Sequence, residues 1–288
     1  MSTQPLEATV ERLCALSKTR YANPYAEIEW PATLDPEQWY LTPELISIYG
    51  TETYARLSEA ERRRLSFYEA VNFFSLNIHG ERPLVEGLAR RLYRKGNDAI
   101  SAYLHHFLDE ENKHMVYFGG FCTRYAGKIY ADKKLAFPRD YAPGEEDFLF
   151  FAKILIFEEI ADGYNIRMSK DARLAPIARR INLLHHLDEA RHLVFGRLLV
   201  PQLFQTYRGR WSDATLQGMR DYLGRYLVAS WNEYSNPEVY RDAGLSEPYA
   251  LKESAFNHPA ARARRRLMSR GCIRFLLANE ILTEEPEL

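Results

Sequence analysis

Two short segments of the chain, DEENKH and HHLDEARH, each contain a Glu-x-x-His motif. The first motif places Glu111 three residues before His114, and the second places Glu189 three residues before His192. In an α-helix, positions i and i+3 lie about 60° apart, so both side chains of a motif can reach the same ion. A mixed shell of carboxylate oxygen and imidazole nitrogen suits iron or manganese. We therefore predict that two helices face each other across a pair of metal ions.

A site of this kind needs carboxylates from two further helices. Four-helix carboxylate proteins combine two Glu-x-x-His motifs with one glutamate from each of the other two helices. In FLFFAKILIFEEIADGYNIR, Glu158 lies in an apolar stretch, where an unpaired carboxylate is strongly unfavourable. Glu159 is its alternative, and only one of these neighbours can bind because adjacent helical residues diverge by about 100°. On the preceding helix we predict Glu81, which follows the apolar run FFSLNI, with Glu69 as the alternative.

A third histidine lies on the same helical face as the second motif. His185, Glu189 and His192 fall within about 60° of one another on a helical wheel. The residues alone leave two interpretations of His185: a further metal ligand, or a hydrogen-bonded core histidine beside the site.

Acidic residues next to the predicted ligands indicate how the site is supported. Glu110 and Asp188 directly precede ligand glutamates. We expect each to accept the outer N–H of a ligand histidine on the facing helix, which fixes the tautomer of that histidine. Asp162, one turn after Glu158, is a further candidate hydrogen-bond partner near the site.

Helical periodicity dominates the chain, few segments alternate with a period of two, and no GxGxxG motif occurs. The class is therefore all-α. We expect one structural domain with three parts: an N-terminal helix and a wrapping arm (1–57), a four-helix metal-binding core (58–206), and C-terminal helices packed on that core (207–288). The predicted helices are 5–18, 58–80 with a kink or restart at Pro83 before 84–93, 98–125, 145–168, 174–204, 212–234, 237–243 and 258–279.

Composition narrows the possible partners and surroundings. The 288 residues are 46% hydrophobic and carry a formal net charge of −1, so no basic excess indicates nucleic acid. The three cysteines are far apart and form no CxxC pair, which favours a reducing, intracellular setting. The N-terminus has no secretory h-region, and no run of about 18 apolar residues occurs. We therefore expect a cytoplasmic protein that does not span a membrane.

The residues assembled above resemble the p-aminobenzoate N-oxygenase family of ferritin-like di-iron enzymes. The resemblance covers roughly residues 22–206 and includes the segment NPYAEIEWP. It is carried by Glu81, Glu111-x-x-His114, Glu158 and His185-x-x-x-Glu189-x-x-His192. The resemblance implies a ferritin-like bundle with a seven-ligand site, in which His185 is a ligand.

The resemblance also implies an activity. Members of the family use two iron ions, which cycle between Fe²⁺ and Fe³⁺, and O₂ to oxidise an amine through a hydroxylamine towards a nitro group. This chain would then act on a small molecule, an amine in a biosynthetic pathway, with electrons from a reductase or a small reductant, and would form a homodimer. Two alternatives stay open: a di-iron C–H hydroxylase or desaturase with the same ligands, and a non-catalytic iron-binding protein.

Overall fold

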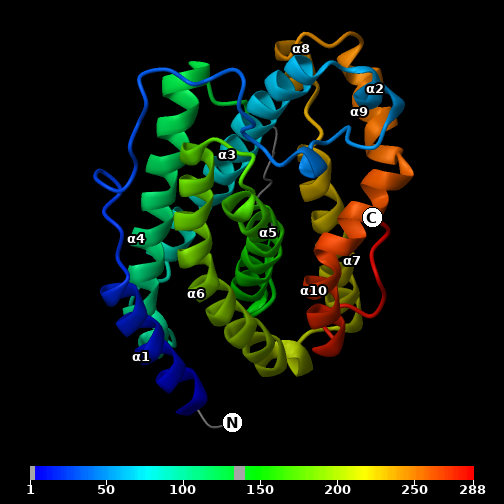
Figure 1. The fold of residues 1–288 in the computed structure, drawn as a ribbon. Coiled ribbons are helices and arrows are strands. Elements are labelled where there is room, and N and C mark those ends of the chain that lie inside the picture. The colour runs from blue at the N-terminus through cyan, green and yellow to red at the C-terminus, as the bar shows by residue number, and fades with distance from the viewer. Residues whose placement is uncertain (1–3, 133–139) are drawn as a thin grey trace.

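The computed structural model describes residues 4–132 and 140–288, and the regular structure in these ranges is helical (Figure 1). No β-strand occurs in either range, and one isolated parallel bridge joins Trp39 to Leu174. The α-helices are α1 (Gln4–Thr19), α2 (Glu52–Arg56), α3 (Glu59–Ala89), α4 (Asp98–Phe121), α5 (Glu145–Lys170), α6 (Pro176–Tyr207), α7 (Asp213–Glu233), α8 (Pro237–Asp242), α9 (Pro248–Asn257) and α10 (Pro259–Ala278). Short 3₁₀ turns occupy Pro43–Leu45 and Arg208–Arg210, and a π-helical turn occupies Cys122–Ala126.

Four long helices, α3, α4, α5 and α6, form the core as two closely packed pairs, α3 with α4 and α5 with α6. Helix α3 begins with a capping box. The backbone N–H of Glu61 donates to Oγ of Ser58 at 3.3 Å, and the backbone N–H of Ser58 donates to the Glu61 carboxylate at 2.8 Å. These bonds satisfy two donors that the first helical turn would otherwise leave unpaired.

Helix α3 runs through Pro83 without ending, so the restart considered for this position does not occur. A proline inside a helix removes one backbone hydrogen bond at a cost of about 3 kcal/mol. Packing on both sides of Pro83 offsets this loss, because Glu81, Leu84 and Leu88 are all buried. The backbone of α3 also approaches α5 closely: a Cβ placed on Gly87 would lie 2.1 Å from the ring of Phe150.

Two further differences from the predicted helices concern helix ends and short helices. The segment predicted as helix to residue 125 leaves the α-helical path after Phe121, passes through the π-helical turn and ends at Gly127 with a φ of 66°. Helices α2 and α9 were not expected. Helix α2 follows a threonine cap and α9 begins at a proline. Both are too short to show the repeated spacing of apolar residues from which a helix is predicted.

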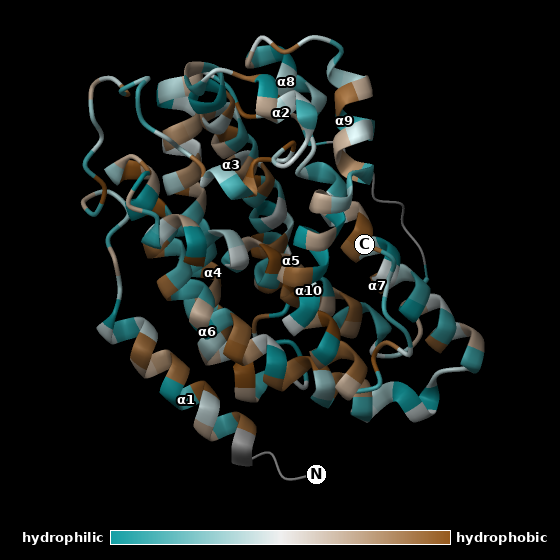
Figure 2. Cartoon of the chain, turned by 45° about the vertical axis from the view of Figure 1, so that its right-hand side comes forward, coloured by the Kyte–Doolittle hydropathy of each residue, from teal (hydrophilic) through white to brown (hydrophobic). Residues whose placement is uncertain are grey.

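The remaining helices surround the core. Helix α1 lies along α4 and α6, α7 and α10 pack on α5, and α8 packs on α3, an arrangement that can be followed in Figure 1. Figure 2 shows apolar residues gathered around α5 and α10 in the middle of the molecule. Within the described ranges, no helix has the length and apolar character needed to cross a membrane. The prediction of an all-α bundle with extra N- and C-terminal helices is confirmed.

Candidate metal centre

All seven side chains predicted as ligands meet in the interior of the four-helix core. Their exposed fractions do not exceed 2%. Helix α3 contributes Glu81, α4 contributes Glu111 and His114, α5 contributes Glu158, and α6 contributes His185, Glu189 and His192. Their donor atoms form three overlapping groups, each with its atoms within 4.8 Å of one another: Glu81, His114 and His185; Glu111, His114 and Glu189; Glu111, Glu158 and His192.

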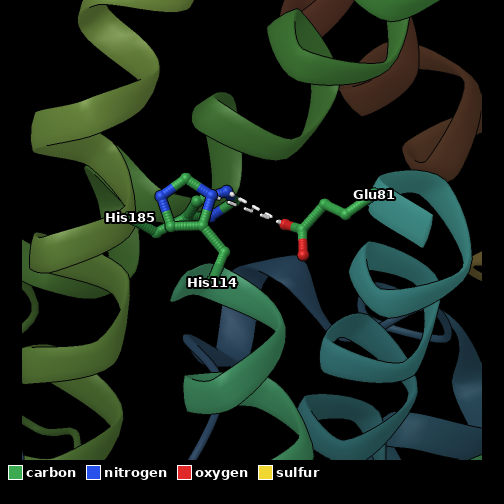
Figure 3. A group of neighbouring side chains, drawn as sticks. All are labelled: Glu81, His114 and His185. Carbon is green, nitrogen blue, oxygen red and sulfur yellow. Dashed lines mark ion pairs between the residues drawn. The ribbon is translucent and has the colours of Figure 1, made fainter. Parts of the chain in front are cut away.

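One end of this cluster is built from Glu81 and two imidazoles (Figure 3). Nε2 of His185 lies 3.5 Å from Oε1 of Glu81 and 2.8 Å from Oε1 of Glu189. Nδ1 of His114 lies 3.8 Å from the same Glu81 oxygen. Figure 3 shows the Glu81 carboxylate on α3 directed at both rings, which come from α4 and α6.

The other end holds His192 and Glu158, and two glutamates lie between the ends. Nδ1 of His192 lies 2.9 Å from Oε1 of Glu111 and 3.5 Å from Oε2 of Glu189. Nδ1 of His114 is 3.7 Å from Oε1 of Glu111 and 3.7 Å from Oε1 of Glu189. Glu111 and Glu189 therefore face both ends, which is the position of carboxylates that bridge two ions.

The hydrogen-bonding state of these atoms is a test of whether metals fit. Within the described residues, neither carboxylate oxygen of Glu81 or of Glu158 takes part in a hydrogen bond, and Nδ1 of His114 and of His192 has no partner. Buried carboxylates and imidazoles without partners are strongly unfavourable unless cations compensate them. Four carboxylates and three imidazole nitrogens with free lone pairs fit two transition-metal ions, iron or manganese among them.

The charges of the cluster lead to the same conclusion. Burial, together with the neighbouring carboxylates of Glu111 and Glu189, raises the pKa of Glu81 well above its ordinary value. Burial and the carboxylate of Glu189 do the same to the pKa of Glu158. Burial also acts to raise the pKa of Glu189, but His192 and His185 outweigh it and hold that pKa below its ordinary value. Two divalent cations would relieve the mutual repulsion of these acids.

The outer nitrogens of two histidines face carboxylates on the opposite helix. Nε2 of His114 lies 3.1 Å from Oδ2 of Asp188, and Nε2 of His192 lies 2.8 Å from Oε2 of Glu110. A carboxylate in this position holds the proton on Nε2 and leaves the lone pair of Nδ1 for a metal. The structure thus brings Glu110 and Asp188 to the partners expected from the sequence.

Two buried cations that the sequence reasoning missed complete this arrangement. Nη2 of Arg191 contacts both Glu110 and Asp188, and Nζ of Lys113 lies 2.6 Å from Oδ2 of Asp188. Burial acts to raise the pKa of Asp188, but its bond to His114 and the charge of Lys113 hold that pKa far below its ordinary value. Each cation directly precedes a predicted ligand histidine in the sequence, a signal that could have identified both.

His185 differs from the other two histidines in orientation. Its Nε2 faces the cluster, and its Nδ1 lies 2.8 Å from the side-chain amide of Asn165 on α5. The ring of Phe118 meets the imidazole edge-on, with centroids 4.9 Å apart. In the structure Nδ2 of Asn165 faces Nδ1 of His185. When Nε2 binds a metal, Nδ1 carries the proton, and the Asn165 amide accepts that proton once it is turned to present Oδ1. The sequence reasoning did not include Asn165.

The residues considered as alternatives lie elsewhere. Glu69 accepts a hydrogen bond from the backbone N–H of Ser47 at 3.1 Å and is not part of the cluster. Glu159 accepts from Nε of Arg197 at 2.7 Å. Asp162 lies 2.6 Å from Nδ1 of His186 and makes its contact there. His186 itself is half-buried beside Asp162.

Comparison with known protein families decides the relationship. The family model described as P-aminobenzoate N-oxygenase AurF matches residues 3–278. The chain belongs to this family. Membership makes it an oxidoreductase of the ferritin-like class, built around a buried histidine and glutamate metal site.

Relatives of this AurF-family protein include an uncharacterized protein of Mycobacterium tuberculosis strain H37Rv and one of Mycobacterium bovis. Each is 25% identical, over 84% of this chain and 78% of the relative. Among solved structures, an R2-like ligand-binding oxidase with an aerobically reconstituted Mn/Fe cofactor matches at a TM-score of 0.51 and 16% identity, over 92% of each chain. A variant reconstituted without air matches at 0.52 and 15% identity, over 96% of this chain and 93% of that one. These structures support the fold.

Proposed function

We propose that this protein is a di-iron oxygenase that uses O₂ to oxidise a small amine at nitrogen, through a hydroxylamine towards a nitro group. The observation that carries the proposal is the third imidazole: Nε2 of His185 faces Glu81 and Glu189 beside the two Glu-x-x-His motifs. The activity for which the family is named, N-oxygenation of p-aminobenzoate, supports the choice of substrate class. The proposed ligands are Glu81, Glu111, His114, Glu158, His185, Glu189 and His192.

Each ligand would have a defined task. Glu111 and Glu189 would bridge the ions, because both lie between the two ends of the cluster. Glu81, His114 and His185 would bind at one end, and Glu158 and His192 would bind at the other. Two bound iron ions would supply the redox chemistry with O₂ that organic side chains cannot supply.

The surrounding residues would keep the site dry and its ligands oriented. The ring of Phe107 stacks on His192 with centroids 3.9 Å apart, and Phe118 covers His185. Glu110 and Asp188 would keep the protons of two imidazoles on Nε2.

Conversion of an amine and O₂ to a hydroxylamine and water consumes two electrons and two protons, so an external reductant is part of the proposal.

The test is product analysis. Protein purified without air and loaded with ferrous iron is exposed to O₂ and a reductant with a panel of aryl and alkyl amines, and products are identified by mass spectrometry. Hydroxylamine or nitro products are expected. Oxidation at carbon with the amine unchanged would contradict the proposal and favour a hydroxylase or desaturase. Accumulation of ferric iron without oxidation of any substrate would favour a non-catalytic iron-binding protein.

A further inference from the structure

The seven proposed ligands lie too deep for a substrate to reach them from solvent in this conformation. Their exposed fractions do not exceed 2%, and the helices that carry them enclose them. Enzymes with closed centres commonly admit their substrates by moving a loop that covers the entrance. A cavity that borders the core, together with the segment that covers it, therefore marks the place where a substrate enters.

A groove of about 780 Å³ lies between residues 27–38, which we call the strap, and the start of α6. The strap is free of helix and strand, and it belongs to the chain between α1 and α2 that passes along α4 and over one end of the bundle (Figure 1). Most of the wall residues are apolar, among them Ile28, Trp30, Leu34, Tyr40 and Ile177. A groove of this size and composition suits a small, largely apolar organic molecule.

A second cavity, of about 830 Å³, lies away from the core. Within the described part of the chain it is lined by α7, by Phe256 of α9 and by residues 282–287, and by no residue of the four core helices. The groove under the strap, in contrast, includes Pro176, Ile177 and Arg180 of α6, the helix that carries three of the proposed ligands. Of these two cavities, the groove is therefore the one that borders the core.

Apolar side chains connect the groove to the His185 end of the centre. Along α6, Ile177, Ile181 and His185 follow one another at intervals of four residues, so they lie on one side of the helix. Aromatic rings form a second connection, with successive centroids 4.9–6.2 Å apart, in the order Tyr40, Phe121, Phe74, Phe118 and His185. The phenylalanine side chains have no polar atoms, so they can change rotamer without breaking a hydrogen bond.

The strap is held at its start by an exposed ion pair and at its end by the backbone. Nη2 of Arg180 pairs with the Glu27 carboxylate, and Nε of Arg180 donates to the carbonyl oxygen of Glu27 at 3.3 Å. These side chains are 41% and 36% exposed, and an ion pair of that exposure contributes about 1 kcal/mol or less. Just after the strap, the backbone N–H of Ala175 donates to the carbonyl oxygen of Trp39 at 2.8 Å. The start of the strap can therefore open while its end stays in place.

Contacts in the middle of the strap define its closed position. Oη of Tyr125 on the π-helical turn donates to the carbonyl oxygen of Pro31 at 2.8 Å. The ring of Trp30 lies directly on α4, where a Cβ placed on Gly120 would be 2.7 Å from it, and Ile28 is buried. One hydrogen bond and apolar packing thus keep the groove covered at rest.

We propose that the strap is a lid, and that a small organic substrate enters the groove beneath it and reaches the His185 end of the metal centre when the Glu27–Arg180 pair opens. The inference rests on the proposed metal centre as the place of reaction. It holds whether the substrate is oxidised at nitrogen or at carbon, because it concerns the route to the centre and not the bond that reacts.

Extraction of iron by a small chelator tests the lid without any oxidation. Protein loaded with ferrous iron is mixed, in the absence of O₂, with 2,2′-bipyridine, a neutral aromatic molecule, and formation of the coloured ferrous complex is followed by absorbance. In Glu27→Cys, Arg180→Cys, a short bismaleimide crosslinks the strap to α6. All proteins also carry Cys14→Ser, since Cys14 is partly exposed whereas Cys122 and Cys272 are buried. The crosslink should slow extraction about tenfold relative to the same variant without it.

Arg208→Cys, Glu280→Cys is the matched control, because it replaces another exposed ion pair that does not involve the strap. The same crosslinker should change its extraction rate less than about twofold. Removal of the ion pair should have the opposite effect: Arg180→Met should speed extraction, whereas Arg208→Met should not, although both substitutions remove an exposed pair that contributes little to stability.

Equal rates before and after the strap is crosslinked, or an equal slowing in the control, would overturn the lid. Equal extraction rates in Arg180→Met and Arg208→Met would also overturn it. The proposed N-oxygenation fails separately, because slow extraction from the crosslinked protein together with substrate oxidation at carbon would support the lid and contradict N-oxygenation.

Discussion

The three histidines of the cluster present different ring nitrogens to it. His114 and His192 face it with Nδ1 and carry an ionised acid on the outer nitrogen, whereas His185 faces it with Nε2 and carries a neutral amide. A carboxylate partner makes an imidazole a stronger electron donor than an amide does. The end of the centre that holds His185 therefore combines one imidazole with a neutral amide partner and one, from His114, with an acidic partner, whereas the other end has the single imidazole of His192.

Glu69 gives a prediction about pH at the residue scale. Burial raises its pKa to about 7, against hydrogen bonds from Ser47 that act to lower it. The folded protein therefore binds a proton more tightly than the unfolded chain, so stability should fall as pH rises from about 4.5 to about 7, by about 3 kcal/mol at most. Glu69→Gln should remove this decline and be more stable than wild type at pH 8.

Urea unfolding of both proteins between pH 4 and pH 8 measures the effect of Glu69→Gln. The two curves should meet at the acidic end and separate as pH rises. A difference that does not change with pH would contradict the prediction.

Which ligands on a single helix point to the same side was predictable from the sequence, because helix geometry fixes which side chains share a face. This covers Glu111 with His114, and Glu189 with His192. The choice between ring nitrogens was not predictable, since it depends on the distance between helices. The same is true of Arg191, whose two acids come from different helices, and of Asp162, which lies beside His186.

At the scale of elements, a network of buried charges joins α4 to α6. Arg191 on α6 contacts Glu110 on α4 and Asp188 on its own helix, and its Nε donates to Oγ of Ser17 on α1 at 3.1 Å. Each proposed metal-binding histidine with an acidic partner thus depends on one guanidinium. The network couples the positions of three helices to the geometry of the centre.

Removal of the Arg191 guanidinium should strongly destabilise the folded protein. Arg191→Met leaves buried carboxylates short of a counter-charge and should lower the free energy of unfolding by about 3 kcal/mol. Arg197→Met, which breaks a more exposed pair with Glu159, is the control and should cost about 1 kcal/mol or less. Urea denaturation compares them. Equal losses would mean that the buried network contributes no more than a surface pair.

The close contact of α3 with α5 predicts opposite stability effects for two glycine-to-alanine substitutions. Alanine favours helix formation over glycine by about 1 kcal/mol, but Cβ at position 87 would collide with Phe150. Gly87→Ala should therefore destabilise the protein by about 1–3 kcal/mol. Gly218→Ala, in the exposed interior of α7 with nothing within 4 Å, should stabilise it by about 0.5–1 kcal/mol. Thermal unfolding of both variants checks the signs, and stabilisation by both would contradict the packing described for α3.

The long helices were predictable from periodicity, and their ends agree with the structure within a few residues. The exceptions have physical causes. Continuation of α3 through Pro83 depends on partners far away in the sequence, and the short helices α2 and α9 lie against the body of the protein with little apolar period of their own. Whether such segments are helical depends on tertiary packing and not on local sequence.

At the scale of the whole molecule, the metal centre ties the four core helices together. Without cations, the acids of α3, α4, α5 and α6 repel one another in a buried space. Metal binding should therefore stabilise the folded state, because a ligand that binds only the folded state raises its stability by about 2.7 kcal/mol at 100 times its Kd. Tm of chelator-treated protein should rise by several degrees when ferrous iron is added. The Glu111→Ala, Glu189→Ala double variant should show no such rise, and an equal rise in both proteins would place the stabilising metal elsewhere.

Metal content is the most direct measurement of all. Wild-type protein purified without air, reconstituted with ferrous iron and freed of unbound metal is analysed by elemental mass spectrometry beside the same double variant. A paired centre built on Glu111 and Glu189 predicts close to two transition-metal ions per chain in wild type and close to none in the double variant. A wild-type protein that retains no transition metal, or a double variant that retains two, would contradict it.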